Sequence, residues 1–154
     1  MQVHLLQDPE SLHSNQKGIN THTHTQTLCL CLSLSGGPSA GGCGNYKDSY
    51  KHNPIYQVNL ERPGPLLVEL RGSRQYSVGF EVVAVTVSTV GDPGPAAPQK
   101  RNSGDYRCGF CYMEADHVPA GLYNVIPTTF LPRQEGPFFL DFASTSALKV
   151  SLLQ

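Results

Sequence analysis

Two closely spaced cysteines, Cys108 and Cys111, have residue types and a spacing that could do chemistry. They lie in the run DYRCGFCYME (105–114), and His117 follows a short way downstream. A deprotonated cysteine is both a nucleophile and a metal ligand, so a C-x-x-C pair raises the prospect of thiol catalysis or of half a zinc site. Which of these is possible depends on the local structure that positions the two thiols.

The five residues 108–112 nearly fit C-G-[SA]-C-[WY], a signature in which the second cysteine is the nucleophile of papain-type enzymes. Such a thiolate is activated by a helix N-terminus and a histidine, with that histidine and an asparagine far downstream. Here the flanking residues alternate as in a strand, bulky Phe110 replaces the small residue, and His117 is the sole histidine after Cys111. We therefore predict that Cys111 is a structural strand residue and that the chain has no catalytic residue.

A zinc site would need two further ligands, and the N-terminal part of the chain offers candidates: Cys29 with Cys31, or His22 with His24. However, residues i and i+3 of a strand point to opposite faces, so Cys108 and Cys111 reach one metal only if Gly109 forms a bulge. We expect buried or half-buried thiols instead, and we predict no metal-ligating residue.

The bulk composition excludes several classes of function. The net charge is −1 and the basic residues form no run, so we expect no nucleic-acid partner. No apolar stretch approaches the roughly 18 residues of a membrane span. The cysteines are odd in number and no secretory signal precedes them, which favours reduced thiols and a cytoplasmic location, with the nucleus as a second compartment.

The residues that surround the cysteines read as short strands. The chain has 15 glycines, 12 prolines and only 15% charged residues, a balance that favours strands and turns over long helices. In the run 54–60, Tyr56, Val58 and Leu60 alternate with Ile55, Gln57 and Asn59, so these three should face a core. We predict about seven or eight strands in an antiparallel all-β sandwich, within 54–60, 65–71, 77–90, 105–114, 122–126, 138–142 and 148–153. The run 91–105 should be a polar loop.

The stretch GLYNVIPTTFLPRQEGPFFLDF (121–142) is the most informative in the chain. It contains two strand-like runs joined by a proline-rich connection, because proline cannot donate to a sheet ladder and so ends strands. From the sequence we interpret it as a hairpin.

Three motifs in order resemble domain III of calpains, a C2-like β-sandwich. They are GGCGNYKDSYKHNPIY (41–56), RGSRQYSVGFEVV (71–83) and the stretch 121–142. The details of the later motifs are most similar to the PalB-like branch of that family. Two departures are the absence of any tryptophan and residues 1–40, which resemble nothing in the family.

The resemblance implies a non-catalytic module of a calpain-type cysteine endopeptidase, because the family's catalytic Cys, His and Asn lie on other domains. It implies contacts with the protease core of a parent calpain or with other proteins, and contacts with ESCRT-III proteins only through MIT domains absent from this chain. The alternative is a free-standing calcium- and phospholipid-responsive C2-like module. Its candidate oxygen ligands are Glu114 and Asp116, with Asp105 and Asp92 in loops. Two close carboxylates are more often a solvated turn, so we predict no cofactor.

Residues 1–40 differ in amino-acid composition from the rest of the chain. They are rich in Ser, Thr, His, Gln and Asn and lack Trp, Tyr and Phe, so we predict disorder there and a sandwich over 41–154. Leu28 to Leu34 could form one strand-like patch. We hypothesise that 1–40 comes from an alternative start or a differently spliced exon, making the chain a fragment or short isoform. An isolated copy could also be too incomplete to fold, which a cooperative melt would argue against.

Overall fold

The computed structural model describes residues 4–6, 24–30, 40–88, 90–91 and 98–154. These residues form strands and one short helix, α1 (Lys47–Tyr50). The strands are β1 (His4–Leu6), β2 (His24–Leu30), β3 (Tyr56–Leu60), β4 (Gly64–Arg71), β5 (Ser77–Val87), β6 (Lys100–Asn102), β7 (Arg107–Cys108), β8 (Phe110–Val118), β9 (Gly121–Thr129), β10 (Phe138–Ser144) and β11 (Leu148–Leu152). No helix in these ranges is long and apolar enough to cross a membrane.

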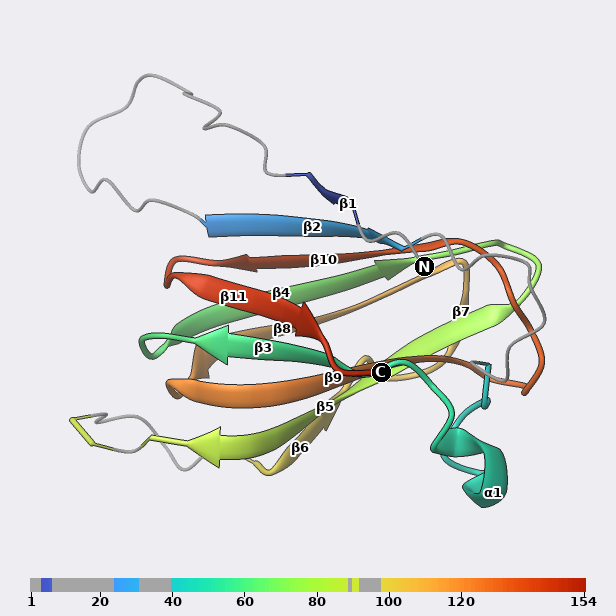
Figure 1. Ribbon diagram of the computed structural model, residues 1–154, viewed down its shortest axis with the longest axis horizontal. Coiled ribbons are helices and arrows are strands. Elements are labelled where there is room, and N and C mark those ends of the chain that lie inside the picture. The colour runs from blue at the N-terminus through green and yellow to red at the C-terminus, as the bar shows by residue number, and fades with distance from the viewer. Residues whose placement is uncertain (1–3, 7–23, 31–39, 89, 92–97) are drawn as a thin grey trace.

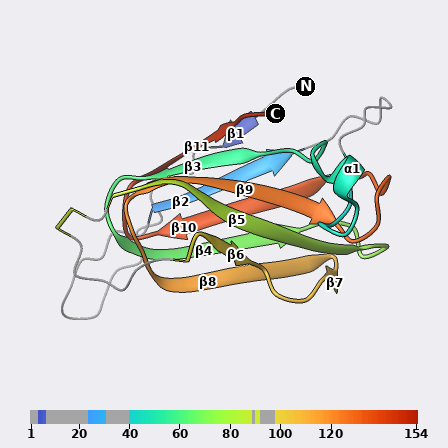
Figure 2. The ribbon, with the colours of Figure 1, turned by 90° about the horizontal axis from the view of Figure 1, so that it is seen from below.

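The strands form two antiparallel sheets that pack face to face, so the predicted all-β sandwich is confirmed (Figure 1). The five-stranded sheet has the order β1-β2-β10-β4-β8, and the six-stranded sheet has the order β11-β3-β9-β5-β6, with β7 also paired to β5. Seen from below, the six-stranded sheet lies nearest the viewer, and α1 lies at the end of the sandwich where the connection between β9 and β10 also runs (Figure 2).

The core lies between the sheets and follows the period-two pattern of the strands. Tyr56, Val58 and Leu60 are buried on β3, as the alternation predicts. Phe80 on β5 and Phe142 on β10 are the largest fully buried side chains, and both belong to the one core cluster. Each sheet therefore contributes a phenylalanine to the core of a chain without tryptophan.

The hairpin predicted for 121–142 is wrong. Strand β9 pairs with β3 and β5 in the six-stranded sheet, whereas β10 pairs with β4 and β2 in the five-stranded sheet. Hairpin loops usually have two to five residues, and the longer connection 130–137 instead carries the chain across the roughly 10 Å between packed sheets. The two runs are strands as predicted, but they lie in different sheets.

Three further elements differ from the sequence prediction. The loop predicted over 91–105 contains β6, which pairs Lys100–Asn102 with Glu81–Val83 of β5. The run 105–114 is divided at Gly109 into β7 and β8. The helix α1 is absent from the prediction because four residues are too few to show a helical period.

Within the segment predicted to be disordered, two short pieces form strands. β2 pairs with β10 along His24–Leu30, and β1 pairs with β2. The free edge of β10 offers backbone N–H and C=O groups that any extended segment can pair with, which composition alone does not show. Disorder stays a prediction for 1–3, 7–23 and 31–39, which lie outside the described residues.

Candidate functional site

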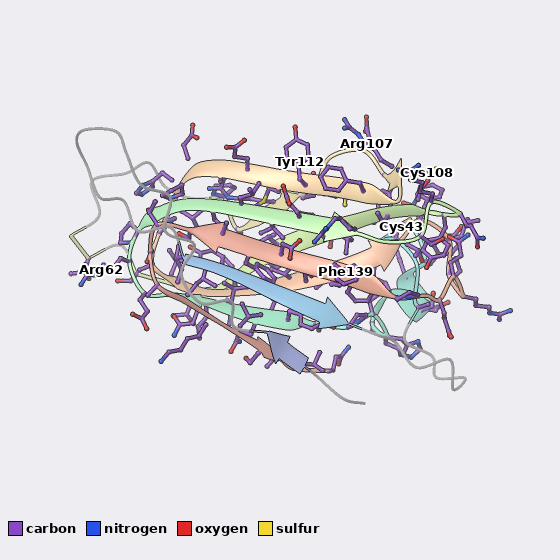
Figure 3. The ribbon with its side chains drawn as sticks, turned by 90° about the horizontal axis from the view of Figure 1, so that it is seen from above. Cys43, Arg62, Arg107, Cys108, Tyr112 and Phe139 are labelled. Carbon is purple, nitrogen blue, oxygen red and sulfur yellow. The ribbon has the colours of Figure 1, made fainter. Side chains whose placement is uncertain are left out.

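The cysteine pair lies where the chain passes from one sheet to the other. Cys108 ends β7, which pairs with β5, and Cys111 lies on β8, which pairs with β4. Gly109 between them has φ 72°, a left-handed conformation that favours glycine, and its carbonyl accepts a hydrogen bond from the Gly72 N–H at 2.9 Å. Cys108 is exposed at the end of the sandwich, as Figure 3 shows, while Cys111 points into the core. The left-handed break at Gly109 therefore leaves the two thiols in different environments.

The environment of Cys111 suppresses its reactivity. Its side chain is buried, and this burial raises the pKa of the thiol to about 11. The nucleophile of a cysteine enzyme needs the opposite shift, a lowered pKa. His117 lies six positions along the same strand, a separation of about 20 Å at the usual rise, far outside hydrogen-bond reach. Cys111 is a strand residue, as predicted.

No group of three or more histidine, cysteine or acidic residues able to hold a metal ion occurs within the part of the chain that the structure describes. Glu114 and Asp116 lie exposed on the same outer face of β8. Asp105 is exposed in the connection between β6 and β7 and is not gathered with them. Of the other candidate ligands, Asp92, His22 and Cys31 lie outside the described residues, as do the side chains of Cys29 and His24.

The structure brings the three sequence motifs together at one end of the sandwich, and Asn53 is the centre of this arrangement. Its side chain is only 1% exposed. Its Oδ1 accepts a hydrogen bond from the Gly41 N–H at 2.9 Å, and its Nδ2 donates to the carbonyls of Gly42 and Tyr50, also at 2.9 Å. One buried amide thus holds the two glycines that begin the first motif against the end of α1, which lies within the same motif.

The first motif in turn holds the connection 130–137. The Cys43 N–H donates to the Phe130 carbonyl at 3.2 Å, and the Arg133 N–H donates at 2.8 Å to the carbonyl of Ala40, the residue just before the motif. The second motif adds a bond from the Phe130 N–H to the Ser77 carbonyl at 2.9 Å. The connection is therefore fixed by backbone hydrogen bonds from both other motifs.

This fixed connection presents apolar side chains to solvent. Phe130 is 42% exposed and Leu131 is 45% exposed. The Thr129 Oγ1 donates to the Leu131 carbonyl at 2.7 Å, and the Tyr106 ring meets the Phe130 ring edge-on at 5.4 Å between centroids. We call residues 130–137 the motif loop. A rigid loop with exposed large apolar side chains is a surface suited to protein contact.

Behind the motif loop lies a cavity of about 40 Å³, lined mainly by apolar residues of all three motifs and of the strands that carry them. Its lining includes Pro54, Tyr76, Val78, Pro127, Gln134 and Phe138. The cavity lies between the two sheets at their ends. It is large enough for water molecules but not for a drug-sized ligand, whose pocket usually has a volume of about 300 Å³ or more.

A polar cluster stabilises the same end from the six-stranded sheet. The Tyr50 hydroxyl of α1 donates to the Glu81 carboxylate of β5, and Lys100 of β6 forms an ion pair with that carboxylate at 2.8 Å. Burial and the Glu81 carboxylate raise the pKa of Tyr50. Glu81 of β5 therefore bonds to side chains of α1 and β6. The sequence did not show this role, because Glu81 is one residue in an ordinary strand pattern.

Comparison with known proteins gives a consistent result. The sequence profile of the family described as calpain large subunit, domain III, matches residues 33–142. The chain is 66% identical to calpain-7 of Sus scrofa and 64% identical to calpain-7 of Homo sapiens, each over 118 residues. It is also 26% identical to calpain-B of Drosophila melanogaster over 132 residues.

The matched region is a small part of those relatives. The 118 residues are 77% of this chain but only 14% of each calpain-7. The matched family profile begins at residue 33, after β1 and β2.

Proposed function

The chain belongs to the calpain family as a calpain-7-like domain III, and from this premise we propose that it is a non-catalytic β-sandwich module that acts through contacts with a protease core or with other proteins. The calpains are cysteine proteases, and domain III is distinct from their protease core. The contact surface that we assign is the motif loop.

The observation that carries this proposal is the exposure of Phe130 and Leu131 on a loop whose backbone is held by hydrogen bonds from Ala40, Cys43 and Ser77. Such a loop loses little conformational entropy when a partner docks, because its backbone is already ordered. Aromatic side chains such as Phe130 are also enriched at the buried cores of protein interfaces.

The test is binding of the full chain to the catalytic region of calpain-7, followed by biolayer interferometry. We expect Leu131→Asp to weaken binding by about tenfold or more. A tenfold loss of affinity corresponds to about 1.4 kcal/mol of binding free energy. Val85→Asp is the matched control, since Val85 is also half exposed but lies on β5 toward the opposite end of the sandwich. Equal loss in both variants, or no binding by the unsubstituted chain, would refute the motif loop as the contact.

An activity assay separates this module from an enzyme. We expect the purified chain to leave casein intact with or without a reducing thiol. Cleavage that depends on a thiol and is abolished by Cys111→Ala would contradict the proposal directly.

A calcium- and phospholipid-responsive module is the alternative that the same protein can test. Under our proposal, titration with calcium releases no saturable heat, and the chain does not sediment with anionic vesicles when calcium is added. Calcium-dependent sedimentation would replace the proposal with this alternative, with Glu114→Gln and Asp116→Asn as the variants expected to abolish it.

We also propose a cytoplasmic location, with the nucleus as a second compartment. Its support is the presence of free cysteines, one of them exposed, which is usual where thiols stay reduced. Microscopy of the fluorescently tagged chain tests this, and accumulation in the secretory pathway would contradict it.

A further inference from the structure

We propose that the outer face of the five-stranded sheet binds a basic segment of a partner protein, with a Lys or Arg side chain of that segment lying in a hollow between Glu114 and Asp116. This goes beyond the proposed function because it concerns a second surface, the outer face of a sheet rather than the motif loop. It follows from the cross-strand register of β10, β4 and β8.

The first outward-facing row of this sheet is aromatic. Phe139 of β10, Arg71 of β4 and Phe110 of β8 lie opposite one another. Phe139 and Phe110 are both 41% exposed. Tyr112 is 47% exposed and stacks on Phe110 with 6.0 Å between ring centroids. Figure 3 shows Tyr112 and Phe139 on the near face of the sheet, toward the end that also carries Cys43 and Cys108.

The next row is acidic and short of donors. Asp141 of β10 lies directly opposite Glu69 of β4, a like-charge pair that is unfavourable across strands. Arg71 satisfies only one oxygen of Asp141, at 2.6 Å from Oδ2, and its guanidinium also lies 5.4 Å from the centre of the Phe139 ring. Among the residues that the structure describes, the other oxygen, Oδ1, is buried and has no hydrogen-bond partner. A buried carboxylate oxygen without a donor is costly, so this row carries negative charge that Arg71 compensates only in part.

The third row contains the hollow. Ala143 of β10 and Leu67 of β4 lie opposite one another, and Glu114 of β8 lies opposite Leu67. Beside them lies a hollow of about 130 Å³, whose lining includes Leu67, Ala143, Glu114 and Asp116. A single water needs only about 10–15 Å³, so there is room for a side chain. An apolar floor beside two carboxylates suits a Lys or Arg, whose aliphatic stem packs while its charged end is paired.

The charges on this face favour a cation from outside. Arg71 is the one cation among the outward-facing residues of β4, β8 and β10, whereas Glu69, Glu114, Asp116 and Asp141 are acidic. In the described ranges Glu69, Glu114 and Asp116 take part in no ion pair. The same charges would repel an anionic membrane, so a basic protein segment is the occupant that fits.

The rows also give the order of residues in that segment. Alternate residues of a strand repeat about every 7 Å, so the aromatic row and the hollow are about 13 Å apart. An extended segment with an apolar residue for the aromatic row and a basic residue four positions away matches both features. We define the acidic–aromatic face by its three rows, at Phe139, Asp141 and Ala143 of β10 and their partners.

Two labelled synthetic peptides test the proposal with the full chain, by fluorescence anisotropy. One has an apolar residue with lysines two and four positions later, and the other has glutamates in place of the lysines. We expect saturable binding of the lysine peptide only, weakened at least tenfold at about 0.3 M salt, because screening acts on exposed charges.

The variants locate the site. The double variant Glu114→Lys with Asp116→Lys should reduce the affinity for the lysine peptide at least tenfold. If this variant does not melt cooperatively, the neutral double variant Glu114→Gln with Asp116→Asn replaces it in the same assay. Asp48→Lys with Glu135→Lys is the control, since both residues are exposed acids at the end of the sandwich that carries α1 and the motif loop, and the charge change is the same. Equal loss in the control, absence of saturable binding, or preferential binding to anionic phosphatidylserine vesicles would overturn the proposal. The Val85 and Leu131 variants leave this binding unchanged, so its failure is distinguishable from failure of the motif loop.

Discussion

At the scale of single residues, the structure turns chemically suggestive groups into structural ones. Cys111 belongs to a motif that resembles a nucleophile, but its thiol lies in the core and burial raises its pKa to about 11. Asn53 belongs to no catalytic pattern, yet its amide makes three hydrogen bonds that hold the first motif in place. Residue type alone therefore says little about the role of Cys111 or Asn53, and the burial of each side chain decides whether it is structural.

The two cysteines should differ sharply in reactivity. In the folded chain at pH 8, Cys108 should react with a thiol reagent at once, whereas Cys111 should react only as the protein unfolds. Kinetics of labelling with Ellman's reagent, with Cys108→Ser and Cys111→Ala compared, will show which residue gives each phase. A fast phase that survives Cys108→Ser but disappears in Cys111→Ala would contradict the burial of Cys111.

The raised pKa of Cys111 also predicts how stability depends on pH. Below the ordinary value of 9.0 the thiol is protonated in both folded and unfolded chains, so it contributes no slope. Between pH 9 and about 11 the unfolded chain releases the proton while the folded chain keeps it, so stability falls as pH rises. The midpoint urea concentration of unfolding should therefore fall less between pH 8 and pH 10 in Cys111→Ala than in the unsubstituted chain.

At the scale of elements, strand patterns were predictable and their partners were not. Alternation in 54–60 correctly placed Tyr56, Val58 and Leu60 in the core, because a strand's side-chain period is local. Pairing is not local, so nothing in 121–142 showed that its two strands belong to different sheets. The acidic–aromatic face was missed for the same reason, since Glu69, Glu114 and Asp141 become neighbours only through register.

The glycines of the first motif offer a matched test of the loop that they form. Gly42 has φ 77°, and a Cβ there would lie 2.7 Å from the Pro132 backbone nitrogen of the motif loop, whereas a Cβ on Gly44 meets nothing within 4 Å. Gly42→Ala should destabilise the fold by more than about 1 kcal/mol, the scale of left-handed strain for an L-residue. Gly44→Ala should be close to neutral. Urea unfolding measures both, and equal effects would show that the contact with Pro132 does not constrain this loop.

At the scale of the whole molecule, the sandwich has an edge that the N-terminal part covers. β2 pairs with β10 from Phe138 to Ser144, and β2 itself lies before the region that matches the calpain family profile. Covered edges protect a sheet from pairing with other chains.

Removal of residues 1–31 should therefore promote self-association. The shortened chain would expose the edge of β10 that β2 covers, while β10 stays paired with β4 on its other side. Analytical ultracentrifugation should show dimers or larger species that grow with concentration. Adding Ala143→Lys to the shortened chain should reduce this association, because a lysine at a sheet edge opposes pairing. A shortened chain that stays monomeric over the same concentrations would show that β2 is not needed to protect this edge.

The alternation of strands between the two sheets has a consequence for how the chain reaches its fold. β3 pairs with β9 and β11, and β4 pairs with β8 and β10, so neither finds its partners until the chain beyond residue 110 is available. Contacts between distant parts of the sequence make folding slow, typically milliseconds to seconds for such all-β domains. During synthesis the early strands therefore emerge from the ribosome long before their partners, and their apolar faces stay open to chaperones until the last strands appear.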